Sequence, residues 1–596
     1  MFMTKSLTVN ESGEYLYWAE PFVKIINLIL ALFSLAAISS LVLQYGFYLT
    51  DSVSAILNRV DLLIVQFYLW QFIFKFLFSR SKLSFLKRHW FEAVLAVLIL
   101  SEFALIIRME GINVIRKYFL DMNITAVTEI YVGFAQILII LSIITEGINY
   151  NTRLASLKFH PAQTMMLSYI VVIFIGTALL MLPKATPSNV SISFIDALFT
   201  ATSATCVTGF TVIDTAGGFT FTGKLIILFL VQIGGLGIMT LSSFLALFFG
   251  QGVGIRERVM LHQMMNIDKI GVISTVLRNA VILTFSIEAA GAILLMFFWA
   301  DQGWTASQLI FNSVFHAISA FCNSGFSTFS DNLSSYHHDI GVLMTISSLV
   351  ILGGLGFIVI LELIGGTVQL KKTHHHSRLS IQSRMVLIIS GLLLLTGFVL
   401  LYTLDDHANG WNRALTAFFN SVTARSSGFN TVDFAALNNS SILIMMILMF
   451  IGASPGSTGG GIKTTTLGIL WASIGAIITG QNRIVIFKRR IPFLVLNRAL
   501  VVFAFSVMVV VISAFLLSIT EKAPIIDIIF ESVSAFSTVG LSRGLTQLLT
   551  TNGKLIIILS MFIGRLGALT LAFAITAPTE LPSVKVEYPS ESVMIG

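Results

Sequence analysis

Long apolar runs alternate with short polar or basic segments along most of this chain. A membrane-spanning helix needs about 20 mainly apolar residues, and four such runs come first, at about 22–49, 60–79, 89–108 and 126–147. The first run is too long for a removable signal peptide and lacks a cleavage pattern. We therefore expect it to remain in place as a membrane anchor.

After His160 the pattern becomes repetitive. Each repeat reads as a long apolar run, a short amphipathic segment, a polar loop with a glycine and a second apolar run. The short segments cannot span a bilayer, which is typical of helices that enter and leave on one side. The first helices are expected at about 166–183, 278–300, 385–404 and 497–519, and the second helices at about 222–249, 339–366, 440–480 and 553–576.

Composition supports this pattern. Of the 596 residues, 56% are hydrophobic and 11% are charged, which excludes an ordinary soluble protein. The fold class expected is an all-α polytopic membrane protein with four repeated helix/pore-loop/helix units around a central pore and about four extra N-terminal transmembrane helices.

Cys206 and Cys322 are interpreted as packing residues, because two cysteines define no disulfide framework. The net charge of +7 does not indicate nucleic-acid binding, because the basic residues gather in short loops between apolar runs.

Basic residues concentrate in alternate loops, which predicts their orientation by the positive-inside rule. Both termini are then cytoplasmic, in a multi-pass protein of the inner membrane, and the glycine loops enter from the outer side. The run His374–His376 lies in a basic inner loop, where a solvated loop is preferred over a metal site. The alternate basic loops contain Arg80, Lys82, Lys87 and Arg88; Arg153 and Lys158; Arg256, Arg258, Lys269 and Arg278; Lys371, Lys372, Arg378 and Arg384; and Arg483, Lys488, Arg489 and Arg490.

The stretch SVTARSSGFNT (Ser421–Thr431) has three counterparts, TATSATCVTGF, SAFCNSGFSTF and SAFSTVGLSRG. Aligned on their glycines, all four have a phenylalanine ten residues upstream and a Phe or Leu directly after the glycine. Four matches at one offset indicate one repeated loop. The glycines are Gly209, Gly325, Gly428 and Gly540, and the upstream phenylalanines are Phe199, Phe315, Phe418 and Phe530.

Four such loops around one axis have a clear chemical use. A cation that crosses a bilayer exchanges its hydration shell for oxygen ligands, and rings of backbone carbonyls supply them. Turning neighbouring carbonyls the same way requires dihedrals that favour glycine. The candidate selectivity filter, with K+ at its glycines, therefore comprises Thr205, Cys206, Val207, Thr208 and Gly209; Asn323, Ser324 and Gly325; Ser426, Ser427 and Gly428; and Thr538, Val539 and Gly540.

Glycine also serves close helix packing in membranes. We keep that interpretation for Gly234, Gly235 and Gly237 and for Gly353, Gly354 and Gly356, which are expected inside second helices. Outside the first three loops stand Asp214, Asp331 and Asp433, which would concentrate cations at the mouth. The fourth unit has Leu545 there, so this acidic ring is incomplete.

The third unit contains FIGASPGSTGGGIKTTT (Phe450–Thr466). A segment with Pro455 and several glycines cannot stay helical, and such backbone occurs at membrane depth only when it is buried in protein or lines water. We expect an intramembrane gating loop below the filter. A nucleotide-binding loop is the disfavoured alternative, because Ile462 separates Gly461 from Lys463 and no strand precedes the motif. The candidate gate residues are Gly456, Ser457, Thr458, Gly459, Gly460, Gly461, Lys463 and Arg565.

Two arginines within apolar surroundings need partners or a water path. Arg565, in IGRLG, is expected as an electrostatic barrier in the inner cavity. Arg425, beside the third glycine loop, is expected to pair with Glu531 and support the filter from behind. The alternative for Arg425 is a side chain that points outward into solvent.

These motifs together resemble a known family. ATSATCVTGF, TARSSGFNT, GSTGGGIKTTT, SAFSTVGLS and IGRLGALT are similar to the superfamily of K+ transporters that contains bacterial Ktr and Trk membrane subunits and plant high-affinity K+ transporters. The tail YPSESVMIG (Tyr588–Gly596) resembles the Ktr type. The resemblance covers the chain from about His160 to its end, roughly three quarters of its length.

The resemblance implies K+ uptake through a four-unit pore whose filter glycines are those named above, with the gating loop below them and Arg565 near the constriction. It also implies a homodimer with one pore in each subunit, regulated by a separate cytosolic nucleotide-binding ring. No tightly bound cofactor is implied; K+, and in some relatives Na+, is the transported ion. Relatives with Ser at the first filter position favour Na+, so Gly209 points to K+.

The part before residue 160 departs from the family pattern. Glu92, Glu102, Arg108, Glu129 and Glu146 lie at or near membrane depth there, without the arginine ladder of a voltage sensor. Packing or dimer contact is preferred over a sensing role. The chain is thus divided into an N-terminal region (1–158) and four units, unit 1 (159–275), unit 2 (276–383), unit 3 (384–495, with the gating loop) and unit 4 (496–596, with the cytoplasmic tail).

Two further interpretations stay open. A secondary transporter of another solute would place half-helices around a central site, usually with inverted symmetry, whereas four matched loops favour a cation pathway. A Na+-permeable member of the same superfamily is the other alternative, and channel and ion-coupled symporter are not separated by sequence. An enzyme is not expected, because no nucleophile, base and orienting group stand together.

The four extra N-terminal helices yield the first prediction. Removing residues 1–155 should leave a core that still transports ions, because the four-unit pattern lies wholly after this point. Ion uptake into liposomes that contain the truncated protein measures this. Loss of transport in a folded, membrane-inserted truncation would show that the N-terminal region is part of the pathway.

Overall fold

A computed structural model describes residues 20–88, 93, 96–97, 161–188, 191–237, 273–364, 379–404, 411–481, 483–567 and 570–571. Helices dominate this part of the chain, as the apolar runs predict, and the predicted all-α class is confirmed. One small antiparallel hairpin pairs β1 (Val485–Ile486) with β2 (Arg489–Arg490). The expected run at 126–147, most of that at 89–108, His374–His376 and the tail from Tyr588 lie outside the described residues.

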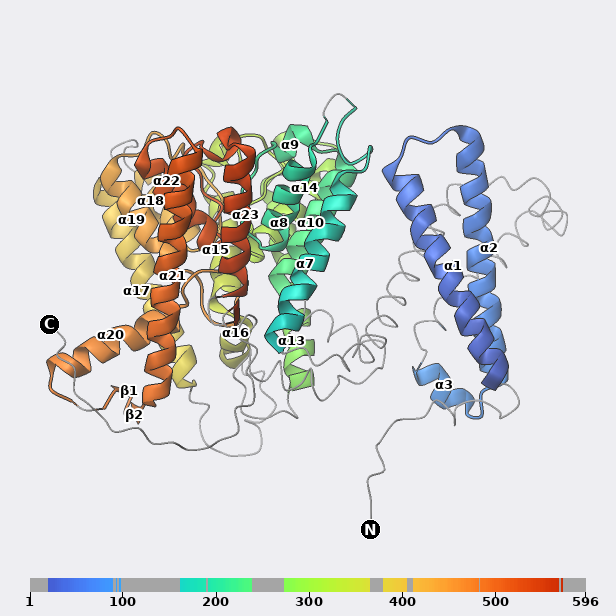
Figure 1. Ribbon diagram of the computed structural model, residues 1–596, viewed down its shortest axis with the longest axis horizontal. Coiled ribbons are helices and arrows are strands. Elements are labelled where there is room, and N and C mark those ends of the chain that lie inside the picture. Colours follow the sequence, from blue (N-terminus) through green and yellow to red (C-terminus); the bar gives the residue numbers. More distant parts are fainter. Residues whose placement is uncertain are drawn as a thin grey trace, which may run out of the picture.

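Each of the four units contains a first helix, a shorter re-entrant helix and a second helix, in the predicted order (Figure 1). The first helices match their predicted positions closely. Unit 1 has α7 (Pro161–Leu180), α8 (Phe194–Thr205), the short α9 (Thr215–Gly218) and α10 (Phe221–Leu236); unit 2 has α13 (Ile273–Phe298), η2 (Ala300–Gln302), α14 (Ala306–Phe321), η3 (Ser334–Tyr336), α15 (Ile340–Leu355) and α16 (Phe357–Leu363); unit 3 has α17 (Ile381–Leu404), α18 (Trp411–Thr423), α19 (Asn439–Phe450) and α20 (Thr464–Ile478); and unit 4 has α21 (Phe493–Thr520), α22 (Ile525–Phe536), η5 (Thr546–Leu548) and α23 (Thr551–Leu566).

The N-terminal region forms a hairpin of α1 (Glu20–Gly46) and α2 (Asp51–Leu77), followed by α3 (Lys82–Arg88). The hairpin stands beside the four units in Figure 1. It meets unit 1 through Lys184, whose backbone N–H donates to the carbonyl of Gly46 at 2.9 Å and whose Nζ donates to that of Gln44 at 2.7 Å. This contact joins the end of α1 to the segment that follows α7.

Five of the described helices are long and apolar enough to cross a membrane, α2 and the first helix of each unit. The second helices are shorter than predicted. α15 and α16 pass the same test only as a pair, with a bend of 102° between them. The structure thus supports a polytopic membrane protein. The second helices of units 1, 2 and 4 end earlier than predicted, whereas the interruption predicted in unit 3 is present.

Glycines break the second helices. Gly237, Gly356 and Gly567 follow α10, α15 and α23 with φ of 79°, 92° and 83°, a conformation that ends a helix and favours glycine. The expected position inside a second helix is therefore wrong for Gly237 and Gly356, although Gly356 also packs closely, since an added Cβ would lie 2.8 Å from the Pro455 carbonyl oxygen. The packing interpretation is confirmed for Gly234 and Gly353, where an added Cβ would collide with the carbonyl oxygens of Thr205 and Phe321 at the ends of α8 and α14.

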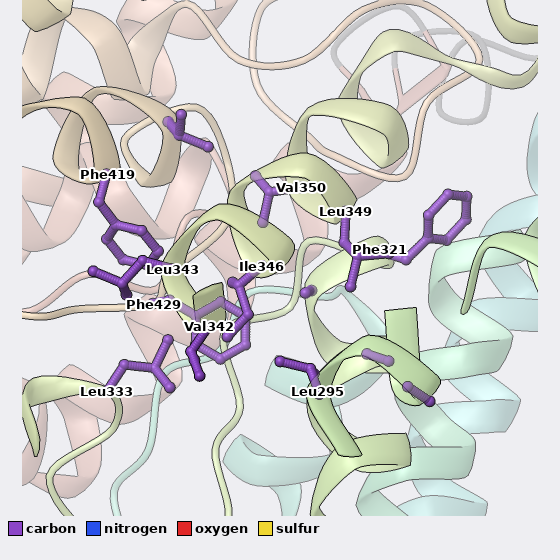
Figure 2. Close-up of a cluster of buried hydrophobic side chains, with 14 of the residues drawn as sticks. Leu295, Phe321, Leu333, Val342, Leu343, Ile346, Leu349, Val350, Phe419 and Phe429 are labelled. Carbon is purple, nitrogen blue, oxygen red and sulfur yellow. The ribbon is translucent and has the colours of Figure 1, made fainter. Parts of the chain in front are cut away.

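The four units follow one another in a closed cycle. The second helix of each unit packs on the re-entrant helix of the next, α10 on α14, α15 on α18, α19 on α22, and α23 on α8. Buried hydrophobic clusters fill all four seams between units. Figure 2 shows the seam between units 2 and 3, where Phe419 and Phe429 lie against Leu343 and Ile346 of α15.

The aromatic residues of the repeat anchor the re-entrant helices in these seams. The residues after the repeat glycines, Phe210, Phe326, Phe429 and Leu541, are at most 2% exposed. Each lies in the seam with the preceding unit. The upstream phenylalanines Phe199, Phe315 and Phe530 occupy the same seams and are fully buried, whereas in unit 3 Phe419 is more deeply buried than Phe418.

The tight contact of α15 with α14 predicts a stability effect. Gly353→Ala should lower the free energy of unfolding by about 1–3 kcal/mol, because the new methyl group overpacks the contact with Phe321. Gly391→Ala in α17 is the matched control, since no atom lies within 4 Å of the place that its new methyl group would take. Thermal unfolding of the purified proteins in detergent compares them, and equal melting temperatures would contradict the packing role.

Candidate functional site

The four glycine loops follow directly from the C-terminal ends of α8, α14, α18 and α22. Of the residues assigned to the candidate filter, those whose backbone atoms meet between loops at the repeat glycines are Thr208, Gly209, Ser324, Gly325, Ser427, Gly428, Val539 and Gly540. Thr205 ends α8, and Cys206 lies in the buried cluster between units 1 and 4. The loops share one unusual backbone pattern. Residues two before each glycine and the glycines themselves all have positive φ: Val207 57° and Gly209 93°, Asn323 60° and Gly325 70°, Ser426 72° and Gly428 78°, and Thr538 49° and Gly540 87°.

Positive φ at non-glycine residues is a feature that the sequence did not reveal. β-branched side chains such as Val207 and Thr538 disfavour this conformation strongly. Such strain persists only where the surrounding structure holds it, and it concentrates at functional sites. Its presence in all four units shows that the loops share one conformation despite different side chains.

The glycines form a ring of close contacts. A Cβ built on Gly209 would collide with the carbonyl oxygen of Ser324, in unit 2. In the same way, a Cβ on Gly325 would collide with the carbonyl oxygen of Ser427, one on Gly428 with that of Val539, and one on Gly540 with that of Thr208 in unit 1. A Cβ on Gly428 would also lie 3.3 Å from the carbonyl oxygen of Thr208, two units away. These contacts place backbone oxygens at a common centre with no room for side chains.

Hydroxyl groups in the last turn of each re-entrant helix hold these loops. Ser203, Ser319 and Thr423 donate to the carbonyls of Phe210, Phe326 and Phe429 at 2.9, 2.7 and 2.6 Å. In unit 4 the Ser534 hydroxyl accepts from the N–H of Gly540 at 3.1 Å. Sequence reasoning missed these residues, although three of the four stand six positions before the glycine.

The intramembrane loop, residues 451–463 between α19 and α20, lies directly against the glycine loops. A Cβ added to Gly459 or Gly460 would meet the side chain of Ser426 or Thr538, respectively. Thr458 binds unit 2, because its backbone N–H donates to Gly353 at 3.3 Å and its hydroxyl donates to Phe321 at 3.1 Å. The expected non-helical loop is therefore present and packed.

Arg565 and Lys463 bind carbonyl groups of this region. The Arg565 guanidinium donates both to the carbonyl of Thr458 and to that of Gly234. It thereby ties the intramembrane loop to unit 1. Nζ of Lys463 donates to the Gly459 carbonyl at 2.7 Å and closes the loop on itself. Together with the contacts above, the loop touches or is tied to all four units.

The expected pair between Arg425 and Glu531 is wrong. The Arg425 guanidinium binds Ser390 of α17, with NH2 3.1 Å from its hydroxyl oxygen and NH1 3.4 Å from its carbonyl oxygen. Glu531 accepts instead from the hydroxyls of Ser542 and Thr546, the latter at 2.9 Å. Arg425 lies two residues beyond the end of α18 and contacts α17, whereas Glu531 lies within α22 and contacts the turn after its own glycine loop.

The three carboxylates that follow the glycine loops also have local partners. Asp214, Asp331 and Asp433 accept from backbone N–H groups at 3.1, 2.8 and 2.9 Å and thereby stabilise the turns that follow the glycine loops.

Two ion pairs that the sequence analysis did not predict involve residues of unit 4 at this end of the molecule. Lys554 contacts Asp196 at 2.6 Å and links α23 to α8 of unit 1. Arg543 pairs with Asp527 and also donates to the carbonyls of Phe434 and Ala435 in unit 3, both at 3.2 Å.

Comparison with known proteins gives one consistent result. The family model for TrkH, described as a cation transport protein, matches residues 132–587. The Ktr system potassium uptake protein B of Bacillus subtilis is 40% identical, over 74% of this chain and 97% of that protein. The potassium/sodium uptake protein NtpJ of Enterococcus hirae is 36% identical, over 74% of this chain and 98% of that protein.

The fold agrees with the sequence match. The crystal structure of the potassium transporter TrkH from Vibrio parahaemolyticus superposes with a TM-score of 0.56 at 21% identity, over 69% of this chain and 83% of that chain. Helices α1 to α3 precede the part matched by the family model. With four units in a closed cycle and a family match over most of its length, this chain belongs to the TrkH family of cation transport proteins.

Proposed function

We propose that the protein mediates K+ uptake across the cytoplasmic membrane through a selectivity filter formed by the four glycine loops. The observation that carries the proposal is the closed ring of contacts between each repeat glycine and a carbonyl of the next unit. A ring of backbone oxygens replaces the hydration shell of a permeating ion. The names of the relatives, potassium uptake proteins, support K+ as the ion.

Hydroxyl groups at the ring support the same conclusion. The side-chain oxygens of Thr208, Ser427 and Thr538 are buried and have no hydrogen-bond partner among the described residues. A buried hydroxyl without a partner costs free energy unless it binds a ligand or water. Oxygen atoms in this position are suited to ligate an alkali cation or its water.

Other cargoes fit less well. A secondary transporter of another solute would place half-helices around a central site, usually with inverted symmetry, whereas the four glycine loops share one backbone pattern. A Na+-permeable pathway is the second candidate, favoured by the name of the potassium/sodium relative NtpJ. Gly209 in the first loop supports preference for K+.

The intramembrane loop is the proposed gate. It lies against the glycine loops of units 3 and 4, and Arg565 holds it by two carbonyl groups. Arg565 also places a positive charge on the proposed ion path, where it opposes cation passage. Release of these contacts would free both the loop and the charge.

The proposal also covers the oligomeric state, the regulatory partner, the orientation in the membrane and the division of the chain. The proposed protein is a homodimer with its own pore in each subunit, gated by a cytosolic nucleotide-binding ring. Both termini are assigned to the cytoplasm, and the five-part division of the chain is retained. In Figure 1 the exposed basic hairpin β1–β2 lies at the end of the molecule opposite to the starts of the re-entrant helices, as the positive-inside rule requires.

The filter assignment predicts altered selectivity for Gly209→Ser and Gly428→Ser. Each added side chain would collide with a neighbouring carbonyl, so preference for K+ over Na+ should fall by about tenfold. Uptake of radioactive Rb+ into liposomes, with and without competing Na+, measures it. Gly391→Ala should behave as wild type. Unchanged selectivity in both serine variants would refute the filter, and the Na+ dependence of wild-type uptake would separate coupled transport from simple permeation.

The gate assignment predicts higher flux after deletion of Ser457–Gly461. The deletion removes the Thr458 carbonyl that Arg565 binds, so the loop no longer blocks the path. Arg565→Gln should act in the same direction. Arg413→Gln is the control, because Arg413 binds the Tyr402 carbonyl far from this loop. Equal or lower flux in properly folded deletion protein would count against the gate.

A further inference from the structure

Two buried polar side chains occupy the same place in units 2 and 4. His316 in α14 and Glu531 in α22 each stand nine residues before the repeat glycine, and both are 0% exposed. Each contacts the serine two residues after the glycine, Ser327 in unit 2 and Ser542 in unit 4. In both units, therefore, the residue nine positions before the glycine contacts the residue two positions after it.

In unit 2 the link reaches the proposed filter. The His316 Nδ1 lies 2.8 Å from the carbonyl oxygen of Asn312, which can only accept, so Nδ1 carries the proton. In the neutral ring, Nε2 then accepts from the Ser327 hydroxyl, 2.9 Å away. The Asn332 carbonyl oxygen lies 3.2 Å from the same hydroxyl oxygen, so Nε2 and this carbonyl share the single Ser327 proton in a three-centre hydrogen bond. The Asn332 side chain donates to the Gly325 carbonyl at 3.3 Å.

In unit 4 the carboxylate holds two hydroxyls. Glu531 accepts from Ser542 and, at 2.9 Å, from Thr546. The Ser542 oxygen in turn accepts from the N–H of Gly544 at 3.0 Å. One side chain thus fixes the whole turn that follows the glycine loop.

Units 1 and 3 lack this link within the described residues. In unit 1 the matching residue is Thr200, whose hydroxyl donates to the Asp196 carbonyl of its own helix at 2.8 Å. In unit 3 the bracing hydroxyl, Thr423, stands one residue closer to the glycine, so the matching residue is Asn420. Its buried Oδ1 has no hydrogen-bond partner. The fold therefore does not require the link.

We propose that His316 and Glu531 are positioning residues that hold the outer ends of the glycine loops of units 2 and 4 and thereby set ion selectivity. This inference rests on the proposed filter. Units 2 and 4 face each other across the cycle, so the two links restrain opposite sides of the ring. Around the four-unit filter, the two loops restrained in this way therefore alternate with the two loops that lack the link.

The test compares K+ over Na+ selectivity of Rb+ uptake in liposomes. His316→Phe keeps an aromatic ring that can stack on Phe329, now 4.6 Å away, but loses the link. Glu531→Leu loses both hydroxyl contacts, whereas Glu531→Gln keeps an acceptor. We expect about fivefold lower selectivity for the Phe and Leu variants, the factor for one hydrogen bond, and recovery of most of it with Gln.

Further variants separate positioning from simple packing. Ser327→Ala should lower selectivity as much as His316→Phe, and the double variant should be no worse than either one, because both remove one link. Thr200→Val is the matched control and should leave selectivity unchanged. Thermal unfolding verifies that each variant is folded.

Three results would overturn the proposal. The first is unchanged selectivity in folded His316→Phe and Glu531→Leu proteins while Gly209→Ser still alters selectivity. This result would overturn the inference but not the proposed filter. The second is a loss of selectivity in the His316→Phe, Ser327→Ala double variant that equals the combined losses of the two single variants. The third is unchanged selectivity in Gly209→Ser as well, which removes the filter and this inference together.

Discussion

The close approach of each repeat glycine to a carbonyl oxygen of the next unit is the contact on which the rest of the molecule depends. Gly209, Gly325, Gly428 and Gly540 have no space for a Cβ. Positive φ at these glycines, and at the residues two before them, turns the backbone so that the ring can close. Because the contact passes from one unit to the next, all four loops must be held in place at once.

The surrounding structure provides this restraint. The loops are anchored in the seams between units by Phe210, Phe326, Phe429 and Leu541. Hydroxyls at the ends of the re-entrant helices bind the loop backbone. Near the starts of the re-entrant helices, Lys554 and Arg543 link unit 4 to its neighbours on both sides. Strain at residues such as Val207 is thus offset by packing and hydrogen bonds in every direction.

At the ends of the second helices the four units are no longer equivalent. The sequences GGLG, GGLG and GRLG end α10, α15 and α23 at Gly237, Gly356 and Gly567, while unit 3 continues into the intramembrane loop. Arg565 stands where units 1 and 2 have glycine and reaches the carbonyls of Gly234 and Thr458. A repeated scaffold therefore carries one irregular segment, the intramembrane loop, and one charge that restrains it.

The sequence by itself determined the membrane class, the four units, the re-entrant helices and the repeat glycines, because apolar run length and glycine placement are local properties of the chain. It also indicated the irregular loop at Pro455. It did not determine the breaks at Gly237 and Gly356, since a glycine suits packing and helix termination equally. Only the tertiary structure decided that Arg425 binds Ser390, that Glu531 binds Ser542, and that Val207 has positive φ. Partner choice and strain depend on contacts between segments far apart in the chain.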